Sequence, residues 1–317
     1  IPKKGQTLQE VRDLLLAEIE KLKKGDFSDD LLPSVINNYK RSYYTSLDNN
    51  KFRAKAFVDA FINNVDWKQE VDRLNRISKM TKAEIVSFAN RFFDNGYAAV
   101  YKVQGADTTI QKVDKPKITP IPTNNDKHSA FLQEIVNHQV EPIKPVFVDF
   151  KKDLTKSTTK KGWPILYKQN TQDDLFTLYL EIPFGKESDL LPGYAKMYID
   201  YLGTDKMTNA QIKQELYKLA CDYDIGQTDD ETYFKLTGLN ENLPKALALI
   251  NDVIDNAKVD KEAYAAAVDL LIKSQKDTKA DQKSNFRALQ NYGMYGAYNS
   301  TRNILSEEQL KNMDPQK

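Results

Sequence analysis

The sequence predicts an α+β fold that occurs twice in related form, with helices packed on one face of an antiparallel or mixed sheet. Three observations support this prediction. Over residues 146–317 strand patterns come first and helix patterns last, which is typical of an α+β domain. Residues 1–105 have mainly helical patterns, and a proline-rich segment, residues 106–145, separates the two regions. The two regions also share a series of landmarks, which indicates an internal duplication.

Residues 1–105 are predicted to be mainly helical. Capping residues and apolar spacing predict four helices, which begin near Thr7, Ser28, Phe52 and Thr81. The β-branched and aromatic run Gly96–Val103 predicts a single strand after a turn glycine. Because one strand is not stable alone, we expect the other strands of this region's sheet to lie outside the sequence.

Residues 106–145 are predicted to be an extended linker that contains one short helix, at about Ser129–Val140. Five of the 12 prolines lie between Pro116 and Pro145. Proline fixes φ and removes the backbone donor that helices and strands need, so regular structure is not expected to continue through this segment.

Residues 146–317 combine strands and helices. Period-two alternation and β-branched residues predict five strands, at about 146–150, 163–168, 175–183, 221–228 and 231–239. The last two form a hairpin around Asp229-Asp230. Apolar spacing predicts helices at about 190–202, 209–219, 243–256, 261–277, 284–298 and from Ser306 onward.

The evidence for duplication is a matched order of short motifs in the two regions. A helix that opens on Phe-Arg-Ala occurs at Phe52 and again at Phe286, and each follows a long helix with a basic-serine motif, at Ser42 and Ser274. A true duplication makes residues 1–105 the second half of a domain. The alternative is that amphipathic helices resemble one another without common origin.

Composition excludes several classes of protein. With 46 basic and 45 acidic side chains the net charge is +1, which argues against a generic nucleic-acid binder. One cysteine, Cys221, excludes an intrachain disulfide and a cysteine-rich metal site, and a small buried apolar role is the default for it. No apolar run is long enough to cross a bilayer.

The two histidines are the first candidates for a metal site. Glu134 and His138 are i, i+4 neighbours if their segment is helical, so a chelating pair is geometrically possible, with His128 and Glu141 nearby in sequence. His128 is ten residues from His138, within proline-rich flanks. We therefore favour two solvated linker histidines over a metal centre.

Four other groups of residues could suggest a binding site, and for each we prefer an ordinary structural role. An acidic group lacks the loop spacing of calcium sites and is better explained as polar turns: Asp222, Asp224, Asp229, Asp230 and Glu231. A lysine group is better explained as a solvated face: Lys151, Lys152, Lys156, Lys160 and Lys161. Tyr194, Tyr198 and Tyr201 lie at helical spacing and could line a chamber wall, although packing is the better explanation. Gly293–Ala297 is too weak for a phosphate loop.

At this point the order of motifs resembles a pitrilysin/insulinase-family zinc metallopeptidase domain. The resemblance rests on a helix that ends in Gly-Thr within Leu191–Thr204, on a hairpin with Thr-Tyr-Phe at Thr232–Phe234, and on Leu-Pro-Lys-Ala-Leu at Leu243–Leu247. Residues 8–105 resemble the second half of the preceding domain in the same family. The resemblance implies four such domains arranged as a clamshell around a peptide-binding chamber. This chain then corresponds to most of the second domain, the linker between the halves and most of the third domain, as a fragment.

The family's zinc site is an inverted His-x-x-Glu-His on the helix that ends in Gly-Thr, with a further downstream Glu. Anchored on Gly203-Thr204, the three motif positions correspond to Tyr194, Met197 and Tyr198. The downstream ligand corresponds to Ser274. None of these side chains binds zinc as imidazole does or acts as a carboxylate base. The resemblance therefore implies no catalytic, metal or cofactor site in this fragment, and zinc bound in the first domain of a full-length protein.

Two functions follow from the resemblance. The first is a non-catalytic part of a zinc-dependent metalloendopeptidase, whose partners are a peptide substrate and the first and fourth domains of the same chain. The alternative is a catalytically inactive relative that acts as a scaffold or interaction subunit. In both, neither nucleic acid nor a membrane span is expected. We expect the bacterial periplasm or cell envelope rather than the cytoplasm, although one cysteine fits either.

Overall fold

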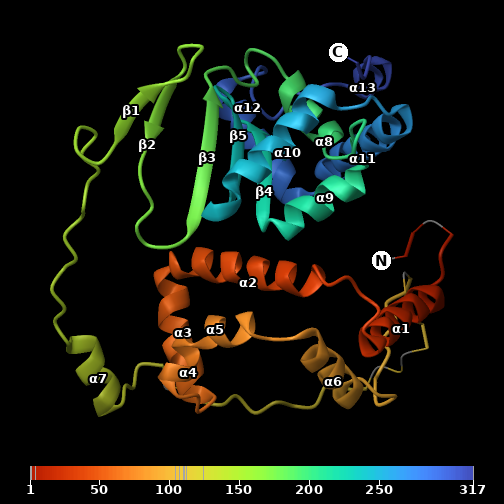
Figure 1. Cartoon of the computed structure of the whole chain (residues 1–317). Helices are drawn as coiled ribbons and strands as arrows, with labels where there is room; N and C mark the ends of the chain where they lie inside the picture. Colours follow the sequence, from red (N-terminus) through yellow and green to blue (C-terminus); the bar gives the residue numbers. More distant parts are fainter. Residues whose placement is uncertain are drawn as a thin grey trace. The chain divides into compact units, whose positions relative to one another are not determined.

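The computed structural model describes residues 2–3, 5–103, 105–106, 108–109, 111, 113–123 and 125–316. It divides into two compact units. The smaller unit comprises Ile1–Leu8 and Tyr97–Gln169, and the larger comprises Gln9–Gly96 and Asn170–Lys317. The candidate site belongs to the larger unit, which Figure 1 shows in red-to-orange and green-to-blue colours.

The smaller unit contains one helix and one hairpin among its described residues. Helix α7, Ala130–Asn137, lies where the sequence predicts a helix, and Ser129 caps it by accepting a hydrogen bond from the Leu132 amide (3.1 Å). Strands β1, Thr155–Thr158, and β2, Pro164–Tyr167, pair antiparallel with Thr155 opposite Tyr167. Strand β2 confirms the prediction at 163–168, whereas β1 was not predicted.

Two predicted strands are wrong. Residues 146–150 and the described residues of Gly96–Val103 have no strand partner and form no strand. Both sequences have the composition of a strand, but a strand also needs a neighbouring backbone with which to exchange hydrogen bonds. The chain supplies none at these two places among the described residues.

The larger unit contains a three-stranded antiparallel sheet in the order β3-β5-β4. The strands are β3, Leu175–Ile182; β4, Cys221–Gln227; and β5, Thr232–Leu239. Opposite the central Leu236 lie Leu178 on one side and Tyr223 on the other, so these three side chains share one face of the sheet. The predicted hairpin at Asp229-Asp230 is confirmed by the β4–β5 pairing.

The main core lies between this sheet and two helices, α9, Asn209–Lys218, and α10, Leu243–Asn256. Its buried members come from both layers: Ile212, Leu216, Cys221, Leu236, Ala246, Ile250 and Val253. Cys221 is therefore a buried apolar side chain, as predicted, and burial raises the pKa of its thiol. Gly238 has no side chain because a Cβ there would lie 2.3 Å from the Cys221 sulfur. A short 3₁₀ turn, η1, Asn240–Asn242, leads from β5 into α10.

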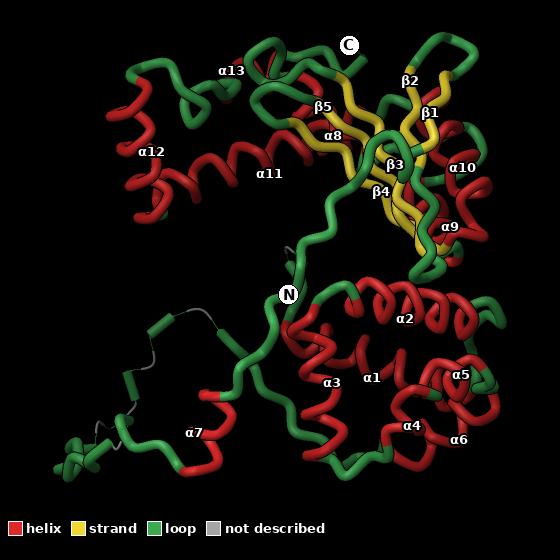
Figure 2. Tube along the Cα trace, turned by 90° about the vertical axis from the view of Figure 1, so that its left-hand side faces the viewer, coloured by secondary structure: helices red, strands yellow, loops and turns green. Residues whose placement is uncertain are grey.

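The remaining helices of the C-terminal region are α8, Leu191–Ile199; α11, Lys261–Ala280; α12, Gln282–Tyr295; and α13, Glu307–Asn312. A second core cluster joins three of them, α8, α11 and α13. Val268 and Ile272 of α11 pack with Leu310 of α13, and Tyr194 of α8 lies against this cluster. Figure 2 shows α11 and α12 as consecutive helices. Asp281 is both the C-cap of α11 and the N-cap of α12. The predicted helix at 284–298 therefore starts and ends earlier than expected.

The N-terminal helices are α1, Leu8–Lys24; α2, Leu31–Leu47; α3, Asn50–Ile62; α4, Trp67–Val71; α5, Arg73–Ser78; and α6, Lys82–Phe92. The capping box at Thr81 and Glu84 is confirmed. Ser28 is not the cap of α2, because the N-cap position is Asp30 and it makes no side-chain capping bond. The short helices α4 and α5 were not predicted. Helix α2 packs against α9, where the Asn38 amide donates to the Tyr217 carbonyl (2.7 Å).

Within the described part of the chain, no helix is both long enough and apolar enough for a membrane crossing.

Candidate functional site

Helix α8 carries the three positions at which the family resemblance predicts metal ligands. Pro192 stands in its first turn, where its missing amide proton costs nothing, and Asp200 ends it. Tyr194, Met197 and Tyr198 lie at i, i+3 and i+4, so they share one side of the helix. The question is whether the structure uses that side for chemistry or for packing.

Tyr198 is a buried packing residue. Its side chain is 9% exposed, and its ring meets Tyr264 of α11 edge-on, with 5.3 Å between the ring centroids. The Tyr198 hydroxyl donates to the Asp260 carbonyl (3.1 Å) and accepts from the Asp260 amide (2.9 Å). Asp260 is the N-cap of α11, so one hydroxyl fixes α8 against the start of α11. Its hydrogen-bonding capacity is then used within the protein.

Tyr194 and Tyr264 make the corresponding contacts to α13. The Tyr194 hydroxyl accepts a hydrogen bond from the Leu305 amide (3.1 Å), just before α13. The Tyr264 hydroxyl donates to the Leu310 carbonyl (2.7 Å), and partial burial raises the pKa of this phenol. Three tyrosines therefore connect α8, α11 and α13 around the second core cluster. Tyr264 and its contacts were not found from the sequence, because nothing local links residues more than 40 positions apart.

Met197 and Ser274 complete the set of predicted positions. Met197 is half-buried, and its thioether is at most a weak acceptor. Ser274 is exposed on α11, and its backbone carbonyl accepts a hydrogen bond from the Thr278 hydroxyl (2.8 Å). None of the four side chains presents an imidazole, thiolate or carboxylate, which are the donors that zinc uses.

The opposite side of α8 is tied to strand β4 by polar contacts. Lys196 forms an ion pair with Asp224, and the Tyr233 hydroxyl also donates to Asp224 (3.2 Å). The hydrogen bond from Lys196 lowers the pKa of the Asp224 carboxyl. The Tyr223 hydroxyl donates to Asp200 (2.9 Å), and burial is the main cause that raises the pKa of Tyr223. These two carboxylates are engaged in holding α8 on the sheet.

The other acidic side chains of this region lie at the β4–β5 hairpin. The Tyr179 hydroxyl donates to Glu231 (3.1 Å), and desolvation followed by that carboxylate raises the pKa of Tyr179 to about 12. The charge of Glu231 raises the pKa of Glu181. The Thr228 hydroxyl donates to Asp230 (2.8 Å) in the turn. Among the residues that the structure describes, no cluster of three or more His, Cys, Asp or Glu side chains could hold a metal ion.

The histidine candidates lie in the smaller unit and are exposed. Helix α7 ends at Asn137, and His138 is its C-cap with extended backbone angles. Glu134 and His138 are therefore not i, i+4 neighbours within one helix, which is the geometry that a chelating pair requires. His128 precedes α7 in a loop.

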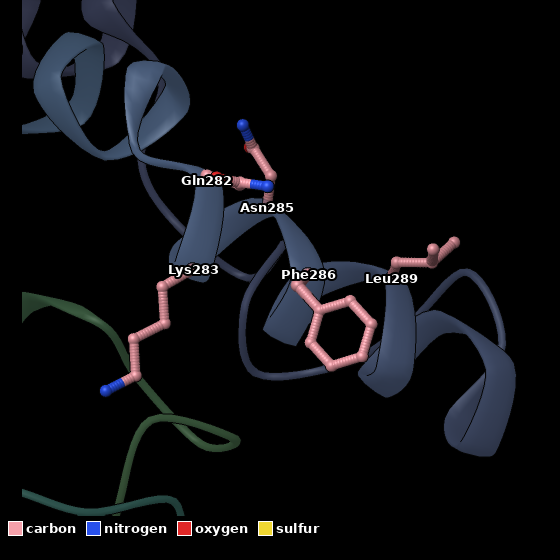
Figure 3. Close-up of a pocket in the computed structure, with 5 residues that line it drawn as sticks. All are labelled: Gln282, Lys283, Asn285, Phe286 and Leu289. Carbon is pink, nitrogen blue, oxygen red and sulfur yellow. The ribbon is translucent and has the colours of Figure 1, made fainter. Parts of the chain in front are cut away.

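A shallow hollow lies elsewhere in the larger unit, on α12 (Figure 3). One helix supplies the whole lining: Gln282, Lys283, Asn285, Phe286 and Leu289. It contains no paired acid and base and lies outside the α8 positions, so it is not a candidate active site.

These features define an α+β domain in which tyrosine side chains hold α8 against α11 and against the segment that leads into α13. Residues 165–303 match the sequence profile of insulinase, peptidase family M16. This segment of the chain belongs to the insulinase family. The match confirms the family that the sequence order indicated.

Individual relatives are distant. A match to the mitochondrial-processing peptidase subunit beta of Neurospora crassa has 22% identity over 130 residues, 39% of this chain and 27% of that protein. Among solved structures, a peptidase M16 inactive domain from Pseudomonas fluorescens has 18% identity and a TM-score of 0.42, covering 50% of this chain and 42% of the other. The periplasmic protease PqqL from Escherichia coli has 12% identity and a TM-score of 0.44, covering 97% and 36%. The chain thus spans about a quarter of the curated relative and less than half of each solved structure.

Proposed function

We propose that this chain is a non-catalytic part of a zinc-dependent metalloendopeptidase and that it supplies chamber wall and the linker between two halves. The observation that carries the proposal is the use of Tyr194 and Tyr198: both hydroxyls bind backbone groups of neighbouring segments. A metal-binding helix needs its ligands free to converge on an ion. Here the same side of α8 is committed to holding α11 and α13.

The domain organisation is part of the proposal. Residues 1–105 would be the second half of one insulinase-type domain, residues 106–145 the linker, and residues 146–317 a degenerate second domain. Zinc would be held by His and Glu side chains of another domain of the same protein, where it would activate water for peptide hydrolysis. The substrate would be a peptide or polypeptide, and the compartment the bacterial periplasm or cell envelope.

The alternative is an inactive relative that acts as a scaffold or interaction subunit. The same packing of α8 supports it, because this packing gives rigidity and no chemistry. The two proposals differ only in whether an intact protein that contains this chain has a metal-binding domain elsewhere.

The first experiment measures zinc in the purified chain by elemental analysis, together with hydrolysis of a quenched fluorescent peptide library. We expect no stoichiometric zinc and no chelator-sensitive hydrolysis. Near-stoichiometric zinc with peptidase activity would overturn the non-catalytic assignment.

The second experiment uses the intact protein and separates the two proposals. We expect chelator-sensitive peptide hydrolysis, with zinc content and kcat unchanged in Tyr194→Phe, which removes only the hydroxyl that contacts Leu305. Absence of zinc and hydrolysis in the unmodified intact protein would favour the scaffold. Loss of zinc in Tyr194→Phe, with the fold intact, would contradict the packing role of this side chain.

A further inference from the structure

The chain contains one Asn-Gly dipeptide, Asn95-Gly96, at the boundary between the two compact units. Helix α6 ends at Phe92, with Phe93 as its C-cap. The smaller unit resumes at Tyr97, directly after the glycine. A covalent change at Asn95 therefore falls where the chain passes from one compact unit to the next.

The surroundings leave Asn95 free to react. Asp94, Asn95 and Gly96 are all exposed and belong to no helix or strand. The Asn95 side chain makes no hydrogen bond to any described residue. Gly96 carries no Cβ that would screen its own backbone nitrogen, and a peptide with glycine has wide torsional freedom. The Asn95 amide carbon and the Gly96 nitrogen can therefore approach each other by rotation of exposed bonds alone.

We propose that Asn95 is a site of spontaneous deamidation and isoaspartate formation. The Gly96 backbone nitrogen loses its proton to solvent base and attacks the Asn95 side-chain carbon. The new C–N bond closes a succinimide ring, and the side-chain nitrogen leaves with a proton as ammonia. One water then opens the ring at either carbonyl. The net reaction consumes Asn95 and water and gives ammonia and either aspartate or isoaspartate, with no change of oxidation state.

We expect the Asp94 carboxylate to slow this reaction. The Gly96 amide donates a hydrogen bond to the Asp94 carboxylate (2.7 Å), so the proton that must leave is held. The negative charge of the carboxylate also disfavours an anionic nitrogen beside it. Removing the carboxylate should accelerate ring closure.

Asn299 provides a matched contrast within the same chain. It precedes Ser300, another small residue, but Asn299 is only 6% exposed. Its amide nitrogen donates to the Gly296 carbonyl (2.8 Å), and its oxygen accepts from the Thr301 amide (3.2 Å). A side chain fixed at both ends cannot turn toward the next backbone nitrogen, so Asn299 is expected to stay intact.

The product would differ from the starting chain in two physical ways. Aspartate adds a carboxylate next to Asp94, and isoaspartate in addition routes the backbone through the side-chain carbon. Each change falls between the end of α6 and Tyr97. We therefore expect the deamidated chain to show altered protease cleavage close to residue 96 while the sheet core is unaffected.

The test incubates the purified chain at neutral and mildly alkaline pH and follows each asparagine by peptide mapping with mass spectrometry. Isoaspartate is detected by labelling with an isoaspartate-specific carboxyl methyltransferase. We expect conversion at Asn95 that accelerates with pH, both products present, and Asn299 unchanged. An intact Asn95 after other asparagines have reacted would overturn the proposal.

Three variants sharpen the test. Gly96→Ala adds a Cβ whose nearest neighbour is the Asp94 carboxylate oxygen at 2.9 Å, and because this oxygen ends an exposed side chain that can rotate away, the fold should tolerate it. We expect it to slow conversion by about tenfold, because the Cβ screens the attacking nitrogen. Asp94→Ala should raise the rate about threefold, since a like charge is removed. Asn95→Asp supplies the chromatographic standard. Equal rates in Gly96→Ala and the unmodified chain would contradict attack by the backbone nitrogen. A rate in Asp94→Ala that is equal to or lower than that of the unmodified chain would contradict the slowing of ring closure by Asp94.

Discussion

The two sets of helices in the larger unit have similar sequence patterns and very different burial. Helix α10 of the C-terminal set buries Ala246, Ile250 and Val253 against the sheet. Helix α1 of the N-terminal set has a comparable apolar stripe but no buried residue, and Leu14 and Leu15 are 58% and 64% exposed. An apolar stripe therefore becomes a core only where a second layer lies against it.

Local structure is nevertheless alike in the two sets. Helices α6 and α13 both begin with a complete capping box, Thr81 with Glu84 and Ser306 with Gln309. Each buries one side chain fully or nearly so, Ala89 and Leu310. The hydrogen bonds of a helix cap come from residues that are neighbours in the sequence, whereas burial depends on residues that are distant in the sequence. The two sets of helices therefore share their capping but not their burial.

The largest loss of stability is expected in the core between α10 and the sheet. Ile250→Ala leaves a cavity at a side chain that is 2% exposed, and we expect it to lower the free energy of unfolding by about 3 kcal/mol. The matched change in the N-terminal set, Leu15→Ala, should cost no more than about 0.5 kcal/mol, because the side chain already meets solvent. Urea denaturation followed by circular dichroism measures both. Equal losses would show that α1 has a covering layer in solution.

A smaller loss is expected at the candidate site. Tyr198→Phe removes the hydroxyl that pairs with both backbone groups of Asp260 and leaves them without that partner. We expect a loss of about 1–3 kcal/mol and no change in zinc content. Tyr201→Phe is the control, since Tyr201 is 40% exposed and lies in the turn just after α8. If Tyr198→Phe were as stable as the control, the hydroxyl would not be a structural contact.

The sequence predicts well what neighbouring residues decide. The helix that follows Thr81 begins where its capping box predicts, and the β4–β5 hairpin lies at Asp229-Asp230 as expected. The strand at Gly96–Val103 was wrongly predicted, since composition indicates a preference for extended backbone and not the presence of a partner. Short helices α4 and α5 were missed because five or six residues carry little periodicity.

For the candidate site, the sequence predicts which side chains occupy the motif positions and favours packing for the tyrosines, but it does not predict which segments they contact. The spacing of Tyr194 and Tyr198 places them on one side of α8, and this is confirmed. The bond from the Leu305 amide to Tyr194 spans 111 residues. No local pattern encodes such a contact, so the use of both hydroxyls as connections between helices required the structure.

Variants of the N-cap residues test the local structure that the two sets of helices share. Thr81→Ala and Ser306→Ala each remove a hydroxyl that accepts from the third helical amide, and a loss of about 1 kcal/mol is typical for either. We expect the larger loss for Ser306→Ala, because α13 has only six residues and positions the buried Leu310. Thermal unfolding of the two variants side by side provides the measurement. A larger loss for Thr81→Ala would mean that α6 is the better anchored of the two helices.

The smallest expected effect is the pH dependence of one ion pair in the C-terminal set, where Lys196 of α8 pairs with Asp224 of β4. The hydrogen bond from Lys196 lowers the folded-state pKa of Asp224. Its stabilisation is therefore fully present above the unfolded-state pKa of about 4 and is lost as the pH falls through the lower folded-state value. Because both side chains are partly exposed, we expect no more than about 1 kcal/mol.

Three variants isolate this pair, Asp224→Asn, Lys196→Met and the double variant, each unfolded by urea at pH 7 and at about pH 3. At pH 7 both single variants should be less stable than the unmodified chain, and the double variant should lose less than their sum. Near pH 3 the coupling should shrink, since part of this stabilisation is lost below the unfolded-state pKa. A coupling that persists unchanged in acid would mean that Lys196 supports α8 by the packing of its aliphatic chain, and the contact between α8 and the sheet would then be apolar, like the core between α10 and the sheet.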